Sequence, residues 1–120
     1  FTHGSVLPEH LDLGLDRMNA EIQAWLRNEV PQPEWIRGSR SPVWNRLYSD
    51  APDLAACDTL ALVLDRLDVE RLVVGHTVQD GGITAYCGGR VWCIDVGMAE
   101  HYGGRTEVLE IRGDAVRGLR

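Results

Sequence analysis

The spacing of apolar residues changes once along the chain, near residue 70, and this change restricts the folds available to it. Before residue 70, two stretches repeat apolar residues every three or four positions, which is typical of amphipathic helices. After residue 70, short apolar runs alternate with polar residues and glycines, which is typical of strands joined by tight turns. The order of helix, long loop, helix and strands predicts an α/β (α+β layered) fold, in which helices pack on a sheet.

Two helices are predicted, near residues 11–29 and 53–67. The apolar face of the first helix would consist of Leu11, Leu15, Met18, Ile22 and Trp25. Ser49 or Asp50 would cap the second helix, with Pro52 in its first turn. We expect the apolar faces of both helices to cover one side of the sheet.

The predicted strands form a mainly antiparallel set, and their segments are RLVVG, GITAY, RVWCID, TEVLEIRG and AVRGL. The pair Gly88-Gly89 is typical of a two-residue hairpin turn, and such a turn would place Thr84 opposite Cys93. The run GDAVRG at 113–118 is predicted to form a turn between the last two strands.

Composition and charge exclude several classes of protein. The chain has 120 residues and a net charge of −6, and its 12 basic residues are all arginines spread along the sequence. Such a chain has no basic patch that would bind nucleic acid. No run of about 18 apolar residues and no signal peptide is visible, so no membrane partner is predicted. The predicted location is cytoplasmic.

The three cysteines, Cys57, Cys87 and Cys93, are predicted to be thiols, mostly buried. Their number is odd and no CxxC spacing occurs, which disfavours a disulfide framework or a complete zinc knuckle. The predicted hairpin register also separates Cys87 from Cys93, so a bond between these two is disfavoured further.

His3 and His76 occupy similar places in the pattern, because each stands beside a glycine at the end of an apolar segment. Phe1 and Thr2 precede His3 as the predicted end of a strand, and the run LVVG precedes His76. Functional groups collect where buried strands end, and neutral imidazole is a good metal ligand. We therefore expect the two rings to converge on one ion, with the glycines leaving space for it. The alternative is a pair of hydrogen-bonded loop histidines.

Four segments in order add a resemblance to a known family. They are FTHGSVLPEH, SPVWNRLYSD, LVVGHTVQDGGITAYCGGRVWCIDVGMAEHYGG and VLEIRGD. In this order they resemble the C-terminal half of calcineurin-like metallophosphoesterases, in particular the bacterial-type, Shewanella-like phosphoprotein phosphatases. The resemblance spans nearly the whole chain. It implies that residues 1–120 form a single partial domain, the C-terminal part of a β-sandwich flanked by helices. An N-terminal half with DxH, GDxxDR and GNH motifs would be its partner.

The resemblance also implies roles for individual residues. His3 in THGS and His76 in VGHT match two late metal-ligand histidines, and both would bind the same ion of a two-metal centre. Arg46 in SPVWNRLY matches an arginine that would hold the substrate phosphate, and Tyr102 in AEHYGG matches an aromatic residue near the metals. Val78 replaces the second histidine of the GHxH motif, which favours the phosphoprotein-phosphatase pattern. The implied cofactors are two divalent metal ions, Mn, Fe or Zn.

The implied activity is hydrolysis of phosphomonoesters, in proteins or in small molecules, by a hydroxide that two metal ions activate. The segment would supply two metal ligands and one phosphate-binding arginine, and alone it would be inactive. Two other interpretations stay open. The first is a non-catalytic structural or interaction module derived from the same fold. The second is a small zinc-binding domain, in which Cys57, Cys87 and Cys93 would have to converge with a histidine.

Overall fold

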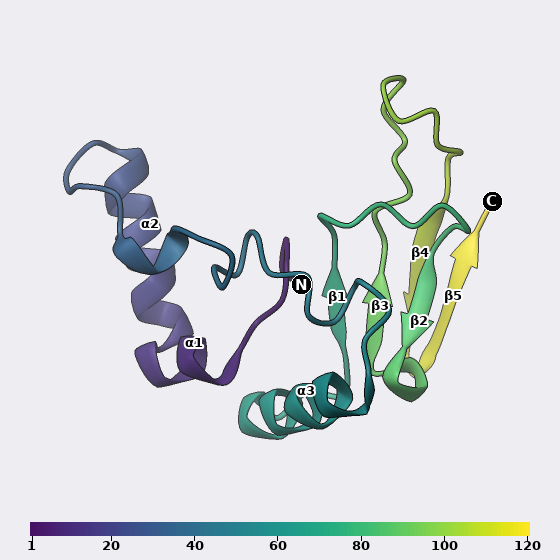
Figure 1. Ribbon diagram of the computed structural model, residues 1–120, viewed down its shortest axis with the longest axis horizontal. Coiled ribbons are helices and arrows are strands. Elements are labelled where there is room, and N and C mark those ends of the chain that lie inside the picture. Colours follow the sequence, from purple (N-terminus) through teal and green to yellow (C-terminus); the bar gives the residue numbers. More distant parts are fainter.

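The computed structural model describes residues 1–120 and confirms a mixed α/β fold (Figure 1). Its elements in chain order are α1 (Pro8–Leu13), α2 (Leu15–Leu26), the 3₁₀ turn η1 (Glu34–Ile36), α3 (Leu54–Leu67), β1 (Leu72–Val74), β2 (Thr84–Tyr86), the 3₁₀ turn η2 (Cys87–Gly89), β3 (Val91–Cys93), β4 (Val108–Arg112) and β5 (Ala115–Leu119). In Figure 1 the amino terminus lies between the α1–α2 pair and the strands, and α3 lies below the strands.

α1 and α2 occupy the segment predicted as one helix near 11–29. Gly14 separates them, because its φ of 92° lies outside the helical region. α2 stands apart from the sheet, so the expectation that it covers the sheet is wrong (Figure 1). Its apolar face borders a cavity shared with residues from 35–43, and the Trp35 indole donates a hydrogen bond to Glu21 Oε2 at 2.7 Å. A neighbouring loop segment thus covers α2.

α3 is the helix that covers the sheet, as predicted. The core cluster consists of Leu7, Tyr48, Ala56, Leu60, Leu64, Leu72, Val74, Val91 and Cys93. α3 begins after Asp53, whose carboxylate accepts a hydrogen bond from the Ala56 N–H at 2.8 Å. The prediction of a cap at Ser49 or Asp50 is therefore wrong. Asp53 offers the same acceptor directly before the first turn, where it can reach the free N–H groups.

The main sheet has the strand order β1-β3-β2. β2 and β3 form the predicted hairpin: Thr84 pairs with Cys93, and the two turn glycines have positive φ values of 68° and 85°. The set is mainly antiparallel, with one exception: β1 pairs with β3 in parallel, with Val74 opposite Cys93. This pairing was not predicted. It arises because the 75–83 connection carries the chain to the far edge before the hairpin returns it beside β1.

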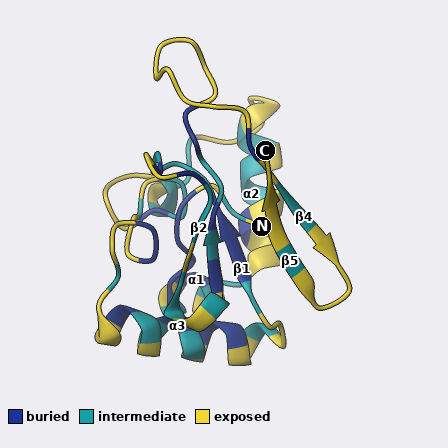
Figure 2. Cartoon of the chain, turned by 90° about the vertical axis from the view of Figure 1, so that its right-hand side faces the viewer, coloured by how far each residue is buried: buried dark blue, intermediate teal, exposed yellow.

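β4 and β5 form a separate two-stranded sheet, whose turn at Gly113-Asp114 lies inside the run predicted to be a turn. Residues of β4 line an apolar cavity of about 380 Å³ together with Val73 of β1 and Ile94, which directly follows β3. Figure 2 shows that the hairpin and the loop before it are largely exposed. None of the helices has the length and apolar character that crossing a membrane requires.

Cys57 of α3 and Cys87 of the hairpin turn form a disulfide, with their Cα atoms 5.3 Å apart. The prediction of three thiols is therefore wrong for these two residues, and it holds for Cys93, which is free and buried. The sequence predicted a hairpin register for Cys87 and Cys93 but no position for Cys57. Only the packing of α3 on the sheet brings Cys57 to the hairpin turn. Disulfides persist mainly in oxidising compartments, so this bond does not support the predicted cytoplasmic location.

His10 is a buried histidine in the first turn of α1, and its Nδ1 accepts a hydrogen bond from the Leu7 N–H at 2.9 Å. Burial lowers the pKa of His10 below its usual 6.5, against the attraction of the Glu9 carboxylate. The unfolded chain therefore takes up a proton at a higher pH than the folded chain does. The contribution of His10 to the stability of the fold is complete above the pKa that His10 has in the unfolded chain. This contribution is lost as the pH falls toward the lower pKa that His10 has in the folded chain.

We predict that acidification from about pH 7.5 to about pH 5.5 lowers the melting temperature, and that His10→Gln reduces this loss. A glutamine oxygen can accept from the Leu7 N–H and does not titrate. The comparison of melting temperatures between wild type and variant isolates His10 from other titrating groups. The exposed His101→Gln is the control and should follow the wild type. Identical pH profiles for wild type and His10→Gln would contradict the prediction.

Candidate functional site

Parallel backbone pairing on both sides of β1 brings three chain segments to the same edge. Thr2 forms a parallel bridge with Val74, the last residue of β1, and Val74 also pairs in parallel with Cys93 of β3. The residues that follow these positions emerge side by side, as the carboxyl ends of parallel strands do. They include His3, His76 and Asp95.

The rings of His3 and His76, called the histidine pair below, meet at this edge. His3 Nε2 lies 3.1 Å from His76 Nδ1, and the ring centroids are 4.8 Å apart. The backbone supports this approach, because the Gly75 N–H donates to the His3 carbonyl at 3.0 Å. Two ring nitrogens at such a distance can share a proton or a metal ion. A tetrahedral ion with bonds of about 2.0–2.1 Å separates its ligand nitrogens by about 3.3 Å.

His76 has an uncommon backbone conformation, with a φ of 64° in the left-handed region. The Thr77 N–H donates to the Gly75 carbonyl at 2.7 Å, so the chain reverses around His76. Such conformations cost of order 1–3 kcal/mol and cluster at functional sites. Burial, then the positive charge of Arg46 and the neighbouring His3 ring, lower the pKa of His76. The ring therefore stays neutral at neutral pH and can offer a lone pair to a cation.

Arg46 and Trp44 lie beside the histidine pair. The Arg46 side chain is exposed, is close enough to His76 to lower its pKa, and forms no salt bridge within the chain. The Trp44 ring stands edge-on to His76, with centroids 5.1 Å apart, and Trp44 is 55% exposed. The charge of Arg46 thus reaches His76, and Trp44, which the sequence analysis did not single out, packs beside the same ring.

Asp95 is a further charged residue at this edge that sequence reasoning missed. Its negative charge partly opposes the lowering of the pKa of His76, and its carboxylate accepts a hydrogen bond from the Gly97 N–H at 3.0 Å. The parallel pairing of β1 with β3 is the signal that would have found it. His76 and Asp95 are each the second residue after paired strand ends, so both leave the sheet at the same edge.

The histidine pair does not complete a metal centre within this chain. No group of three or more histidine, cysteine or carboxylate side chains is arranged to hold a metal ion. His76 Nε2 is buried without a hydrogen-bond partner, whereas ligand histidines usually donate their second ring N–H to a carbonyl or carboxylate. The chain therefore offers two imidazole nitrogens and not a full coordination sphere.

Gly4 has a packing role, which differs from the expected role of leaving space for an ion. A Cβ at Gly4 would lie 2.8 Å from the carbonyl oxygens of both Pro42 and Asn45. The Gly4 N–H also donates to the Pro42 carbonyl at 2.8 Å, which fixes this close approach. A Cβ at Gly75, by contrast, would lie at an ordinary distance of 3.5 Å from the His3 carbonyl. The absence of a side chain at Gly4 therefore lets the segment of His3 pack directly on the loop that contains Pro42 and Asn45.

Tyr102 is not brought against the histidine pair. It is 64% exposed, and its ring packs on His101 with centroids 5.0 Å apart. The cavity that Tyr102 lines has a volume of about 240 Å³, and it is lined by Val78 and Gln79 but by neither histidine of the pair nor by Arg46. The role implied for Tyr102 near the metals thus stays a prediction.

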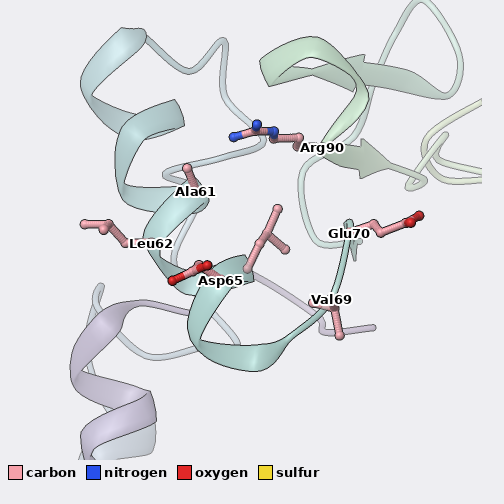
Figure 3. A pocket seen from close by; sticks show the side chains of 7 residues that line it. Ala61, Leu62, Asp65, Val69, Glu70 and Arg90 are labelled. Carbon is pink, nitrogen blue, oxygen red and sulfur yellow. The ribbon is translucent and has the colours of Figure 1, made fainter.

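A cavity of about 440 Å³ lies between α3 and the start of β1, and none of the site residues above lines it (Figure 3). Its charged lining residues are Asp65, Glu70 and Arg90. In Figure 3 the carboxylates of Asp65 and Glu70 point away from each other, so they do not form a cation site. No histidine or cysteine lines this cavity. We therefore place the candidate site at the histidine pair.

Comparisons with known proteins point to phosphatases. Shewanella-like protein phosphatase 2 of Arabidopsis thaliana is 40% identical over 123 residues, which cover 96% of this chain and 31% of that protein. The chain is homologous to a phosphatase. An uncharacterised protein of Schizosaccharomyces pombe is 30% identical over 116 residues, which cover 92% of this chain and 35% of that protein. No family model matches the chain.

Solved structures of phosphatases share the fold of this chain. A mutant of a cold-active protein tyrosine phosphatase matches with a TM-score of 0.75 at 23% identity, over 97% of this chain and 36% of that one. The cold-active protein tyrosine phosphatase of a psychrophilic Shewanella species matches with a TM-score of 0.69 at 19% identity. The match covers 98% of this chain and 39% of that one. The chain spans about a third of the length of the curated relatives that it matches.

We predict that Gly4→Ala destabilises the fold by about 1–3 kcal/mol, the usual cost of forcing a methyl group into a packed region. Gly75→Ala is the matched variant and should cost clearly less, because its methyl group meets only two atoms of His3, at the ordinary contact distances of 3.5 and 4.0 Å. Urea unfolding followed by tryptophan fluorescence measures both changes. Equal losses for the two variants would show that the backbone contact at Gly4 is not what requires glycine there.

Proposed function

We propose that this chain is part of a calcineurin-like metallophosphoesterase, a phosphoprotein phosphatase-like enzyme that hydrolyses phosphomonoesters of proteins or small molecules. One observation carries the proposal: His3 Nε2 and His76 Nδ1 lie 3.1 Å apart beside an arginine without a carboxylate partner, Arg46. The similarity to Shewanella-like protein phosphatase 2 supports phosphatase activity of the whole polypeptide. The four ordered sequence motifs support the metal-dependent class.

The residues present fit one side of a metal centre. The two nitrogens are separated by nearly the distance of two ligands on one ion, and the lowered pKa of His76 keeps its ring neutral. Mn, Fe and Zn all accept imidazole ligands, so the donor set is compatible with each. When bound, two divalent ions would supply an activated hydroxide and neutralise charge on the phosphoryl oxygens. The remaining ligands would come from other parts of the polypeptide.

Arg46 would bind and orient the phosphoryl group. Its planar guanidinium offers paired N–H donors, which match two oxygens of a tetrahedral phosphate. Arg46 forms no salt bridge with a carboxylate of the chain, although Asp50 and Asp53 line the same cavity. The Trp44 ring stands beside His76, with the two centroids 5.1 Å apart. These side chains bind and position a phosphate, and we propose that the 120 residues alone are inactive. The cytoplasmic location stays a prediction.

In the full-length polypeptide, we predict that His3→Ala and His76→Ala each remove bound metal and lower kcat at least about a hundredfold. Loss of a metal removes several kcal/mol of transition-state stabilisation. Elemental analysis after loading with Mn²⁺ and hydrolysis of p-nitrophenyl phosphate measure the two effects. His101→Ala, outside the site, should leave metal content and rate unchanged. Full metal content and full rate in both variants would refute the ligand role.

We predict that Arg46→Lys raises KM about tenfold or more and weakens inhibition by inorganic phosphate to a similar degree. An ammonium group cannot reproduce paired contacts to an anion, and a hydrogen bond to a charged group contributes about 1.5–3 kcal/mol. Arg37→Lys is the matched control, because Arg37 bonds to Gln32 on an exposed loop away from the site. Unchanged KM and unchanged phosphate inhibition in Arg46→Lys would exclude Arg46 from the site.

A further inference from the structure

We propose that Gln79 is a positioning residue of this site, whose side-chain amide holds the loop of His76 against the loop of Arg46. The inference rests on the proposed function, because it assigns Gln79 to the geometry of that site. Gln79 lies on the connection between β1 and β2, three residues beyond His76, and is 8% exposed. A buried glutamine in a loop must satisfy several polar groups, and its partners here reach both loops.

The amide nitrogen of Gln79 links the two loops directly. Nε2 donates hydrogen bonds to the Ser49 carbonyl at 3.0 Å and to the Thr77 carbonyl at 2.9 Å. Neither carbonyl accepts another hydrogen bond within the chain. A buried polar group left without its partner costs about 1–3 kcal/mol. The amide at position 79 therefore controls how closely the two loops approach each other.

Ser49 and Thr77 lead directly to the site residues. The Ser49 N–H donates to the Arg46 carbonyl at 3.0 Å and closes the turn that begins at Arg46. The Thr77 N–H closes the turn around His76 through the Gly75 carbonyl. The hydroxyl groups of Ser49 and Thr77 also bond to each other at 2.7 Å. One amide and one hydroxyl pair thus set the distance between the two turns.

Gln79 is itself held by the sheet. Its N–H donates to the Asp95 carbonyl after β3 at 2.8 Å, and its carbonyl accepts from the Gly82 N–H at 3.0 Å. Its Oε1 accepts from the Tyr86 hydroxyl of β2 at 3.4 Å. Every polar group of Gln79 therefore has a partner. Because these partners lie on or beside β2 and β3, the sheet positions the amide, and the amide positions the loops.

The contact requires a donor at position 79. In Gln79→Glu, a carboxylate oxygen would face the carbonyl oxygens of Ser49 and Thr77, and the acceptors would repel one another. In Gln79→Leu, the volume is similar but both carbonyls lose their donor. Either change separates the turn of Arg46 from the turn of His76. A misplacement of about 1 Å between binding group and reacting centre can cost about a hundredfold in rate.

The test uses the full-length polypeptide loaded with Mn²⁺ and compares Gln79→Leu and Gln79→Glu with Trp35→Phe. Trp35→Phe removes the hydrogen bond to Glu21 of α2 and lowers stability away from the histidine pair, so it controls for destabilisation. Both Gln79 variants should lower kcat/KM for p-nitrophenyl phosphate about 10–100-fold and weaken inhibition by inorganic phosphate. Trp35→Phe should keep wild-type kinetics. In an Arg46→Ala background, Gln79→Leu should cost much less than it does alone.

Hydrogen–deuterium exchange adds a measurement that needs no catalysis. Gln79→Leu should speed amide exchange in both 46–50 and 75–79, because both turns lose the same support. Wild-type kinetics together with wild-type exchange would overturn the inference. A wild type that binds no metal and hydrolyses no phosphomonoester would overturn the proposed function instead. In that case the exchange rates would still decide whether Gln79 couples the two loops.

Gln79→Met keeps the test decisive if Gln79→Leu and Gln79→Glu do not fold. Its flexible, unbranched side chain occupies the space of the glutamine but offers no N–H to the Ser49 and Thr77 carbonyls. A several-fold loss of kcat/KM in folded Gln79→Met would support the inference. Wild-type kinetics in folded Gln79→Met would contradict it, since the two turns would then keep their positions without the amide.

Discussion

The parallel pairing of Val74 with Thr2 on one side and Cys93 on the other is the contact on which the candidate site depends. Backbone hydrogen bonds of this kind fix the direction in which each chain segment leaves the sheet. Because all three segments run the same way, the residues after them emerge at one edge. His3 and His76 become neighbours although they are far apart in the sequence. Without this pairing, no backbone contact would bring the segments of His3 and His76 together.

Loop contacts then convert this shared edge into a defined geometry. Gly4 lets the segment of His3 lie directly on the backbone of Pro42 and Asn45, which brings the Arg46 loop close. The amide of Gln79 joins that loop to the turn of His76. The positive φ of His76 is an energetic cost that such contacts must offset. Backbone and amide contacts therefore position the two loops, and the ring nitrogens that these loops carry lie 3.1 Å apart.

This edge combines two imidazole rings, which would bind a cation under the proposed function, with an arginine, which would bind an anion. Burial and the charge of Arg46 keep His76 neutral, so its nitrogen lone pair is free to bind a metal. The Arg46 guanidinium has no carboxylate partner and can accept a phosphate. Under the proposed function, a phosphoryl group would lie between the metal ions and this arginine. The chain's similarity to a protein phosphatase supports that proposal.

Features that arise from residues close together in the chain could be predicted from the sequence. The three-to-four spacing before residue 70 located α3, and the Gly88-Gly89 turn determined the register that pairs Thr84 with Cys93, because both arise within one short segment. The short motifs around His3, Arg46 and His76 marked the residues that the structure places near one another. The remaining features appear only when the chain is folded. The disulfide of Cys57, the position of Asp95 and the packing of Gly4 depend on which distant segments touch. Periodicity describes one segment at a time, and only the folded chain determines which surfaces meet.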